Sequence, residues 1–268
     1  MRTIVHLSDL HFGRIDRALI EPLLANVESI RPDVVVVSGD LTQRAKQAQF
    51  EQARDFLARI RAPQVVVPGN HDVPLYRVWE RFLSPLGKYR RVITPDLEPT
   101  FVDDEIAVVG VNTARALTFK DGRINHEQMA SIRRRLAPLG EAVTKVVVTH
   151  HPFDLPDQAG DVDLVGRARA ALEVFSKCGV DLLLAGHFHV SQAGASERDG
   201  VAGYSALVVQ AGTATSTRGR GEENSFNVLR IENKSIVVER WTWHAETSSF
   251  RADREERFAR DGERWVER

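Results

Sequence analysis

Histidine, aspartate and asparagine side chains follow five short apolar runs of this chain, at the point where each run ends. The clearest case is the run Val65 to Val67, which a Pro-Gly turn separates from an amide, an imidazole and a carboxylate. Such polar groups are costly to bury without partners, so the sequence predicts that they meet something polar. The residues placed in this way are Asp9, His11, Asp40, Asn70, His71, His150, His187 and His189.

The runs before these residues have the character of buried β-strands that alternate with amphipathic helices. Apolar side chains recur at helical spacing over residues 19–30 and 50–60, between strand-like runs at 4–7, 34–37 and 65–67. This alternation is typical of parallel strands joined by crossovers, and it resumes over residues 146–184. Open α/β sheets place ligands beyond the carboxyl ends of their strands, so the polar residues are expected at one edge.

The rest of the chain is less regular. Residues 74–95 are expected to form a helix followed by a loop, residues 101–111 a hairpin, and residues 129–136 a short helix. The runs 207–209, 226–231 and 236–243 indicate antiparallel strands. Residues 250–268 are dense in charge, yet Phe250, Phe258 and Trp265 recur at about helical intervals, which predicts a charged surface helix or arm. Without a composition break, residues 1–268 are expected to form a single domain.

Seven of the polar residues, all except His71, form a set of metal-ligand types with four imidazoles, two carboxylates and one amide. The set is too large for one tetrahedral zinc and contains no thiolate. Asp-x-His and His-x-His would place both side chains on one face of an extended segment. The set suits two adjacent divalent or trivalent ions with a shared carboxylate, a clamp for in-line phosphoryl displacement. Manganese, iron, zinc and cobalt all accept such ligands, so the identity of the metal stays open.

In chain order, the blocks Asp-x-His, Gly-Asp, Gly-Asn-His-Asp, His-His-Pro and Gly-His-x-His resemble the five signature blocks of the calcineurin-like metallophosphoesterase superfamily. The resemblance spans residues 9 to 189. It implies an α/β fold, a four-layer αββα sandwich of two packed mixed β-sheets flanked by helices. It also implies two ions held by seven side chains: Asp9, His11 and His189 on the first, Asn70, His150 and His187 on the second, and Asp40 bridging them.

The resemblance gives His71 a catalytic role instead of a metal. His71 would face the scissile phosphate, stabilise the developing charge and protonate the leaving oxygen, while a metal-bound hydroxide attacks in line. His151 competes with His150 for the ligand role, and His150 is preferred because the first imidazole of the family's His-His-Pro block coordinates. Asp72 is expected to orient a neighbouring imidazole without binding metal.

The local blocks favour a phosphodiesterase. Phosphoprotein phosphatases resemble Gly-Asp-x-x-Asp-Arg-Gly, and the carboxylate that would support the catalytic imidazole there is Gln43 in this chain. The compact length and the Gly-Asn-His-Asp block are more similar to class III cyclic-nucleotide phosphodiesterases and related glycerophosphodiesterases. Hydrolysis of small phosphodiesters such as 3′,5′-cyclic nucleotides is therefore expected. The alternatives are a phosphomonoesterase, a nuclease or a nucleotide-lipid pyrophosphatase on the same metal core, and a non-catalytic scaffold.

Substrate contacts are expected from Asn70 and His71, and from residues in loops at the same edge of the sheet. An arginine guanidinium can grip phosphate oxygens in a bidentate manner. The loop candidates are Arg14, Arg44, Arg115, Arg218 and Asn112.

Composition limits the class of protein and its partners. With 268 residues, 43% hydrophobic content and a net charge of −1, the chain has the composition of an ordinary globular protein. Neither nucleic acid nor a membrane is expected as a partner, while a homo-oligomer is possible. The single cysteine, Cys178, excludes an internal disulfide and is expected to be buried. A strand-like run at the N-terminus leaves no room for a signal peptide, so a cytoplasmic location is expected.

Overall fold

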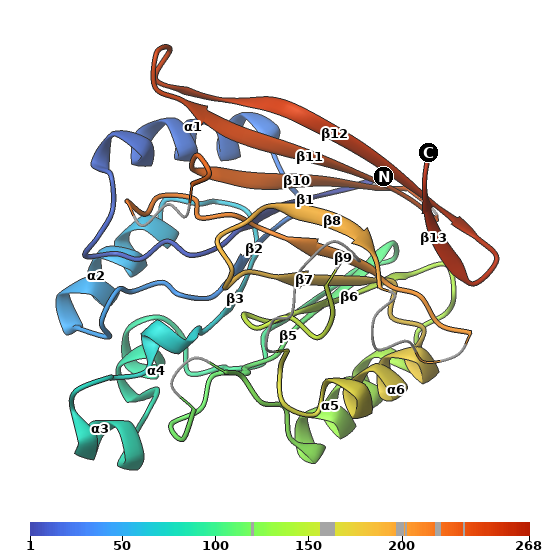
Figure 1. Cartoon of the computed structure of the whole chain (residues 1–268), viewed down its shortest axis with the longest axis horizontal. Helices are drawn as coiled ribbons and strands as arrows, with labels where there is room; N and C mark the ends of the chain where they lie inside the picture. Colours follow the sequence, from blue (N-terminus) through green and yellow to red (C-terminus); the bar gives the residue numbers. More distant parts are fainter. Residues whose placement is uncertain (119–120, 156–163, 197–200, 202, 218–220, 233) are drawn as a thin grey trace.

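Two β-sheets pack face to face in the computed structural model of this chain, and helices cover the outer faces of both (Figure 1). The structure describes residues 1–118, 121–155, 164–196, 201, 203–217, 221–232 and 234–268. The four-layer αββα sandwich implied by the resemblance is thereby confirmed. No helix among the described residues combines the length and hydropathy that crossing a membrane requires.

The first sheet joins three N-terminal strands to four C-terminal strands. Its members are β1 (Arg2–Leu7), β2 (Val34–Ser38), β3 (Gln64–Val67), β10 (Ser225–Glu232), β11 (Ser235–His244), β12 (Ser249–Asp261) and β13 (Arg264–Glu267). Their order across the sheet is β13-β12-β11-β10-β1-β2-β3. The pairs β1–β2 and β2–β3 are parallel, whereas β10 and the strands beyond it pair antiparallel.

The second sheet has six strands, four of which are parallel neighbours. Its members are β4 (Thr100–Val102), β5 (Ile106–Gly110), β6 (Thr144–Val148), β7 (Leu182–Ala185), β8 (Gln192–Ala195) and β9 (Leu207–Gln210). They lie in the order β4-β5-β6-β7-β9-β8. The expected hairpin is confirmed as the antiparallel pair β4–β5. The strand at 207–210 pairs parallel with β7 and antiparallel only with β8, so its expected antiparallel setting is partly wrong.

Each sheet has its own set of covering helices. The short 3-10 helix η1 (Arg17–Leu19), α1 (Ile20–Ile30), α2 (Gln47–Leu57) and α4 (Gly87–Val92) lie on the first sheet, and α5 (His126–Leu136) and α6 (Ala168–Cys178) lie on the second. The 3-10 helix η2 (Asn70–Asp72) follows β3, and α3 (Val78–Leu83) follows η2. Residues 74–95 therefore form two short helices instead of the one expected.

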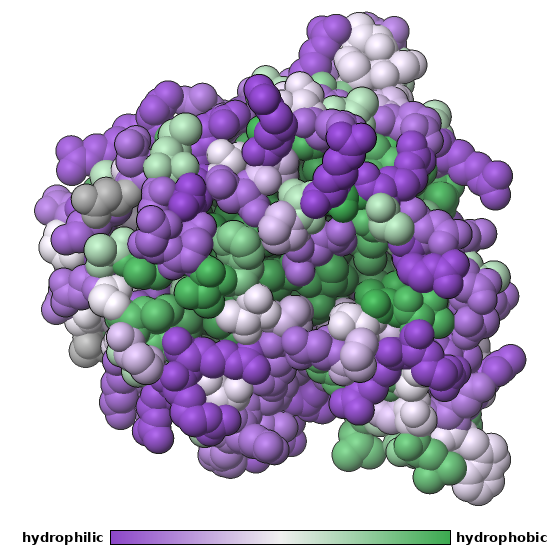
Figure 2. Space-filling model, turned by 180° about the vertical axis from the view of Figure 1, so that it is seen from behind, coloured by the Kyte–Doolittle hydropathy of each residue, from purple (hydrophilic) through white to green (hydrophobic). Residues whose placement is uncertain are grey.

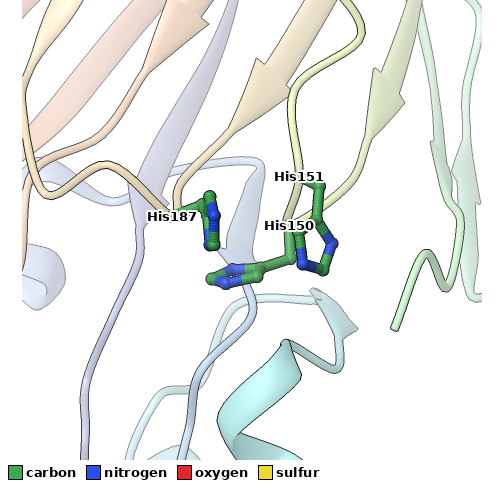
Figure 3. A group of neighbouring side chains, drawn as sticks. All are labelled: His150, His151 and His187. Atoms are coloured by element: carbon green, nitrogen blue, oxygen red, sulfur yellow. The ribbon is translucent and has the colours of Figure 1, made fainter. Parts of the chain in front are cut away.

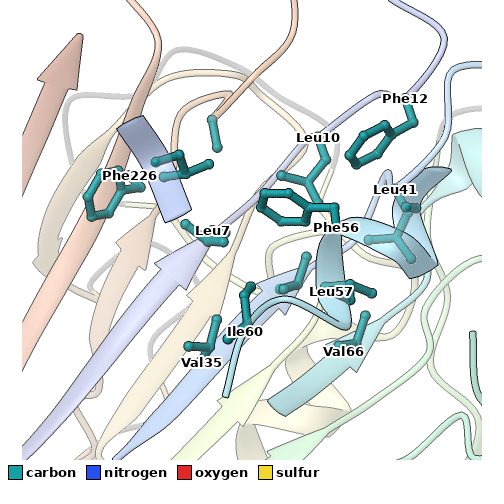
Figure 4. Close-up of a cluster of buried hydrophobic side chains, with 14 of the residues drawn as sticks. Leu7, Leu10, Phe12, Val35, Leu41, Phe56, Leu57, Ile60, Val66 and Phe226 are labelled. Carbon is teal, nitrogen blue, oxygen red and sulfur yellow. The ribbon is translucent and has the colours of Figure 1, made fainter. Parts of the chain in front are cut away.

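The parallel strands are apolar on both faces because both of their faces are covered. In β2, Val34 and Val36 point into the core between the sheets, whereas Val35 and Val37 face the helices. Figure 4 shows the helix-side core, where side chains of the β-strands meet those of α2. Cys178 is buried at the end of α6, as expected.

The C-terminal tail is β-structure, and the surface helix expected over residues 250–268 is wrong. Phe258 and Trp265 are buried between the sheets, while Phe250 is buried on the helix side. Residues eight apart on a regular strand would share one face. The register of the β11–β12 pair shifts by one residue at Asp253, which reverses the alternation between Phe250 and Phe258. The spacing of Phe250, Phe258 and Trp265 therefore resembles that of a helix, although the segment is β-structure.

Truncation of Trp265 tests how firmly the last strand belongs to the core. Trp265 is only 3% exposed and packs between the sheets. We expect Trp265→Ala to lower the free energy of unfolding by about 3–5 kcal/mol, the usual loss for a buried aromatic side chain. Urea unfolding followed by circular dichroism measures the change. Arg264→Ala, at an exposed position of the same strand, should leave the midpoint unchanged; equal midpoints for both variants would show that β13 contributes little.

Candidate metal centre

Loops that follow the parallel strands of both sheets meet at one edge of the sandwich. The backbone N–H groups of Asp9 and His11 donate to the carbonyls of Gly39 and Asp40, which joins the loops after β1 and β2. Across the sheets, Nδ1 of His150 lies 2.8 Å from the Ser38 carbonyl oxygen. The edge predicted from the strand direction therefore brings the polar residues of five segments together.

Three of the predicted ligands form a compact group. Oδ1 of Asp9 lies 3.1 Å from Nε2 of His189 and 3.5 Å from Nε2 of His11. The two imidazole nitrogens lie 3.2 Å from each other. All three side chains are buried, so their ligand atoms converge on a point closed off from bulk water.

A second group lies beside the first. Nε2 of His150 lies 3.1 Å from Oδ1 of Asn70, and one nitrogen each of His150, His151 and His187 lies within 4.8 Å of the others. Figure 3 shows these three imidazole rings gathered at the ends of their strands. Nδ1 of His151 lies 2.8 Å from the Thr113 hydroxyl, whereas Nε2 of His150 also faces Asp40. This geometry favours His150 over His151 as the ligand.

Asp40 lies between the two groups. One carboxylate oxygen lies 3.4 Å from Nε2 of His150, and the other lies 3.7 Å from Nε2 of His11. The first oxygen also accepts a hydrogen bond of 2.8 Å from the backbone N–H of His71. A carboxylate with one oxygen toward each group has the placement that a bridging ligand requires.

The backbone at these positions differs from the sequence-based expectation. Five of the seven predicted ligands have left-handed backbone conformations, with φ between 50° and 78°. The assumption that extended segments present both side chains of Asp-x-His and His-x-His on one face is therefore wrong. Non-glycine residues adopt this conformation at a cost of about 1–3 kcal/mol each, and such strain clusters at functional sites. The five residues are Asp9, His11, Asp40, His187 and His189.

Two glycines allow the ligand loops to approach so closely. Gly39 has a φ of 93°, and a Cβ there would lie 2.6 Å from Nδ1 of His150. A Cβ at Gly69 would collide with the carboxylate and the backbone nitrogen of Asp40. Since any side chain at either position would displace a ligand, the Gly-Asp and Gly-Asn-His blocks need glycine for steric reasons.

The carboxylates of the cluster are held in their charged form. Burial alone would raise the pKa of Asp40, but the neighbouring His150, His71 and His11 outweigh it and lower that pKa. Burial is likewise outweighed at Asp9, whose pKa is lowered by the adjacent imidazoles of His11 and His189. Burial lowers the pKa of His150, yet the charge of Asp40 raises it to about 9. The centre therefore holds two ionised carboxylates, which favour positive charge beside them.

Two observations indicate that the residues of the two groups fit a pair of metal ions. Oδ1 of Asp9 and Nδ1 of His11 and His189 are buried without a hydrogen-bond partner among the described residues, and that oxygen lies where the two imidazole Nε2 atoms converge. Nitrogen and oxygen ligands without a thiolate suit manganese, iron, zinc and cobalt alike. These side chains therefore fit metal cations, but they do not determine which metal binds.

His71 is placed beside the ligands and is partly exposed. Its Nδ1 lies 2.9 Å from the backbone carbonyl oxygen of Gln43, and its ring meets the His11 ring edge-on at 4.9 Å. A carbonyl oxygen only accepts hydrogen bonds, so Nδ1 carries a proton and Nε2 is the nitrogen left for chemistry. The support for the imidazole is a neutral backbone group instead of a carboxylate.

Asp72 was expected to orient an imidazole. In the structure it supports the loops instead. Its buried carboxylate accepts hydrogen bonds from the backbone N–H groups of Leu41, Thr42 and Gly69, at 2.9–3.1 Å. Burial and the charge of Asp40 raise the pKa of Asp72 to about 6, although these amides oppose the shift. Asp72 thereby locks the loop that carries Asp40 to the loop that carries Asn70.

The loop candidates for substrate binding occupy different surroundings. Arg14 lines a surface cavity of about 560 Å³ beside the loop after β1, and Arg44 lies 5.7 Å above the ring of Tyr76. The Arg115 guanidinium donates to the carbonyls of Asn112 and Ala114. Arg115 is thus engaged with its own loop, and Arg218 lies outside the described residues.

Hydroxyl residues of the site were not foreseen. The Ser8 hydroxyl donates to Oδ2 of Asp9 at 2.7 Å, and the Thr213 hydroxyl donates to the Asp9 carbonyl at 2.8 Å. The Thr215 hydroxyl donates to the Leu10 carbonyl at 2.7 Å. These contacts hold the first ligand loop in its left-handed conformation. Serine and threonine are too common in loops for the sequence to mark them.

The remaining histidines have structural or surface roles. His6 is buried, with Nε2 2.8 Å from the Ser38 hydroxyl, and burial lowers its pKa to about 3. His126 is exposed at the start of α5. His244 lies 2.9 Å from the Asp253 carboxylate on the β11–β12 hairpin.

Comparison with known proteins identifies the family of this chain. Residues 2–191 match the family model of the calcineurin-like phosphoesterases. The chain therefore belongs to the calcineurin-like phosphoesterase family, which uses a dinuclear metal centre. It is a metal-dependent hydrolase of phosphoric esters.

Particular relatives are cyclic-nucleotide phosphodiesterases by name. The chain is 28% identical over 262 residues to the cAMP/cGMP dual specificity phosphodiesterase of Mycobacterium tuberculosis, covering 87% of this chain and 77% of that protein. It is 27% identical over 200 residues to the 3′,5′-cyclic adenosine monophosphate phosphodiesterase of Escherichia coli, covering 69% of each. The solved purple acid phosphatase of yellow lupin matches with a TM-score of 0.74 at 13% identity, over 97% of this chain and 54% of that one. This last likeness concerns the fold alone.

Proposed function

We propose that this protein hydrolyses small phosphodiesters, such as 3′,5′-cyclic nucleotides, at a centre of two metal ions. The observation that carries the proposal is the placement of Asp40 between two ligand groups, with the His71 imidazole beside them. The names of the relatives support the same class of substrate.

The proposed ligands divide between the two ions as the two groups divide in space. Asp40 would bridge the ions, because its oxygens face both groups. Metal binding would also satisfy Oδ1 of Asp9, which is buried without a hydrogen-bond donor among the described residues. The terminal ligands would be Asp9, His11 and His189 on the first ion, and Asn70, His150 and His187 on the second.

The exposure of the residues indicates where the substrate enters. Asn70, His71 and His187 are partly exposed, whereas Asp9 and Asp40 are buried beneath them. A phosphodiester would therefore approach from the side of these three residues. The Asn70 amide can donate to a phosphate oxygen, and His71 lies where it can reach an ester oxygen.

When bound, two metal ions would supply an ionised water for in-line attack and neutralise charge on the phosphate oxygens. The protein's own contribution is orientation and proton transfer. The Gln43 carbonyl fixes the His71 ring through Nδ1–H, so the proton given to the leaving alkoxide would come from Nε2–H of the imidazolium form. The hydrogen bond from the His71 backbone to Asp40 ties the acid to the metal-binding carboxylate.

Substrate preference tests the proposal. We expect the metal-loaded protein to hydrolyse a 3′,5′-cyclic nucleotide and bis(p-nitrophenyl) phosphate with higher kcat/KM than p-nitrophenyl phosphate. Steady-state assays with manganese, iron, zinc and cobalt, each added to metal-free protein, measure the preference. A higher kcat/KM for the monoester in every metal would contradict the diesterase assignment.

A non-catalytic scaffold is the alternative outside enzymology. Such a protein has no reason to keep seven converging ligands and an adjacent imidazole, yet all eight residues are present. Metal analysis of the same preparation separates the two possibilities, because a scaffold would retain less than about one ion per chain.

A further inference from the structure

The helix α3 (Val78–Leu83) is amphipathic in the reverse sense, with Arg81 inside and its apolar residues outside. Arg81 is 3% exposed, whereas Val78, Trp79, Phe82 and Leu83 are between 53% and 81% exposed. A surface helix normally turns its apolar side chains toward the core. Four exposed large apolar residues within one six-residue helix indicate a surface that something else covers.

The reverse orientation of α3 is built into the fold. The buried Arg81 guanidinium donates to the carbonyl oxygens of Pro74, Ala116 and Thr118, at 2.7–3.0 Å. The bonds to Ala116 and Thr118 fasten the inner face of α3 to the loop after β5, and the bond to Pro74 fastens it to the segment before α3. The apolar face therefore cannot turn inward without leaving a buried guanidinium unpaired.

The apolar surface continues on both sides of the helix. Tyr76, just before α3, is 77% exposed, and Leu117, in the loop that Arg81 contacts, is 82% exposed. Figure 2 shows hydrophobic side chains protruding at the lower right, where α3 lies when the view of Figure 1 is turned. We call this the α3 surface: Tyr76, Val78, Trp79, Phe82, Leu83 and Leu117.

The α3 surface lies in a strongly basic part of the chain. Residues 74–92 contain five basic residues and one acidic residue, although the whole chain has a net charge of −1. Glu80, the acidic one, is already paired with Arg77 and Lys88. Arg90 and Arg91 are exposed in α4, so basic residues outnumber acidic ones in this segment.

We propose that the α3 surface docks this protein on an anionic lipid membrane. Exposed tryptophan, tyrosine, phenylalanine and leucine beside arginines are the residue types that enter the boundary between headgroups and acyl chains. Arginines near an anionic bilayer add electrostatic attraction to the headgroups. The sequence-based expectation of no membrane partner rested on net charge and overall composition, and neither registers a local surface of this kind.

Charge argues against a second copy of this chain as the occupant. A two-fold interface places each residue opposite the same surface of its partner. Two α3 surfaces would therefore bring Arg77, Arg90 and Arg91 of both copies close together, with Glu80 already occupied. Like charges disfavour such an interface, whereas an anionic bilayer compensates them.

Docking through α3 would bring the metal centre near the lipid surface, whichever phosphoester it hydrolyses. Tyr76 of the α3 surface contacts Arg44. The residue before Arg44 is Gln43, whose backbone carbonyl oxygen accepts the hydrogen bond from the His71 imidazole. The docking surface and the open side of the centre therefore belong to the same edge of the sandwich, where the strands β1 to β3 end (Figure 1).

Vesicle binding by the full chain tests the proposal without reference to activity. We expect the protein to co-sediment with vesicles of phosphatidylcholine and phosphatidylglycerol, and less with phosphatidylcholine alone or at high salt. Trp79→Ser combined with Phe82→Ser should weaken this binding at least about tenfold, because two interfacial aromatic side chains are lost. Val102→Ser, at an exposed valine outside the α3 surface, is the matched control and should bind like the parent.

Two further readouts distinguish membrane docking from other causes. Trp79→Phe should retain binding but lose the blue shift of tryptophan fluorescence that vesicles induce. The double serine variant should hydrolyse soluble bis(p-nitrophenyl) phosphate at the parent rate, so a failure of the proposed reaction is seen separately. Absence of vesicle binding by the parent, or binding that the double variant retains, would overturn the proposal. So would concentration-dependent dimerisation that the double variant abolishes.

Discussion

We expect the Asp40→Asn variant to lose bound metal and hydrolytic activity together. The two oxygens of Asp40 face the two ligand groups, and its lowered pKa keeps the carboxylate charged. Asparagine has nearly the same shape, and its amide oxygen can still accept the hydrogen bond from the His71 backbone. The substitution therefore removes the bridging charge and leaves the loop in place. Metal affinity should fall by more than about 100-fold, the upper range for loss of an outer-shell partner.

The measurement is metal content by atomic emission after dialysis, taken beside kcat/KM for a diester. Asp55→Asn, at an exposed carboxylate of α2, controls for loss of a negative charge and should keep both. Circular dichroism of the metal-free variant should match that of the metal-free parent. A variant that kept two ions and lost only rate would show that Asp40 does not bridge.

The position of the candidate metal centre could be predicted from the sequence because its residues follow buried strands. The valine runs of β2, β3 and β6 are apolar on both faces, which only a covered parallel sheet explains. Parallel strands of one sheet end at one edge, so Asp40 and Asn70 were expected to meet there. His150 follows β6 of the other sheet, and its place beside them depends on how the two sheets pack. The expected helices α1, α2, α5 and α6 follow from the 3.6-residue period in the same way.

The local geometry of the centre could not be predicted, because it depends on contacts between distant segments. Asp9 and His11 adopt left-handed conformations that their own residue types disfavour. Hydrogen bonds from Thr213 and Thr215, more than 200 residues away, hold this loop. Nothing in residues 8–12 indicates those partners.

The β-structure of the C-terminal tail and the outward apolar face of α3 were not predicted, for a related reason. In the tail, a one-residue bulge separates Phe250 and Phe258 onto opposite faces of β12, so their interval carries no reliable period. In α3, the apolar residues face outward because Arg81 finds three carbonyl acceptors inside. Hydrophobic patterning assumes that apolar side chains point inward, and tertiary hydrogen bonds override it here.

The presence of Gln43 instead of a carboxylate affects how His71, the proposed proton donor, is held. In this chain the side of His71 away from the centre meets the Gln43 backbone carbonyl at 2.9 Å. A neutral acceptor fixes the ring and its tautomer, as a carboxylate would, but adds no charge. The orientation of His71 therefore depends on the backbone of the loop after β2, which Asp72 holds through two of its amides.

We expect His71→Ala to keep its metal and to lose on the order of 10²-fold or more in kcat, the usual contribution of a positioned proton donor. The contact of His71 with Asp40 is made by the backbone N–H, which alanine retains. The ligand groups therefore stay intact while the proton donor is lost. The deficit should shrink for diesters whose leaving group is acidic, such as p-nitrophenol, because a good leaving group needs no protonation.

The comparison that decides the role of His71 is kcat for a cyclic nucleotide against kcat for bis(p-nitrophenyl) phosphate, at matched metal content. His126→Ala, at an exposed histidine of α5, should leave both values unchanged. If His71→Ala emptied the centre, the imidazole would be a metal ligand. The geometry allows this role, because one ligand atom each of His71, His11 and Asp40 lies within 4.8 Å of the others. If both substrates slowed equally with the metal retained, His71 would act by stabilising charge on the phosphate and not by protonating the leaving oxygen.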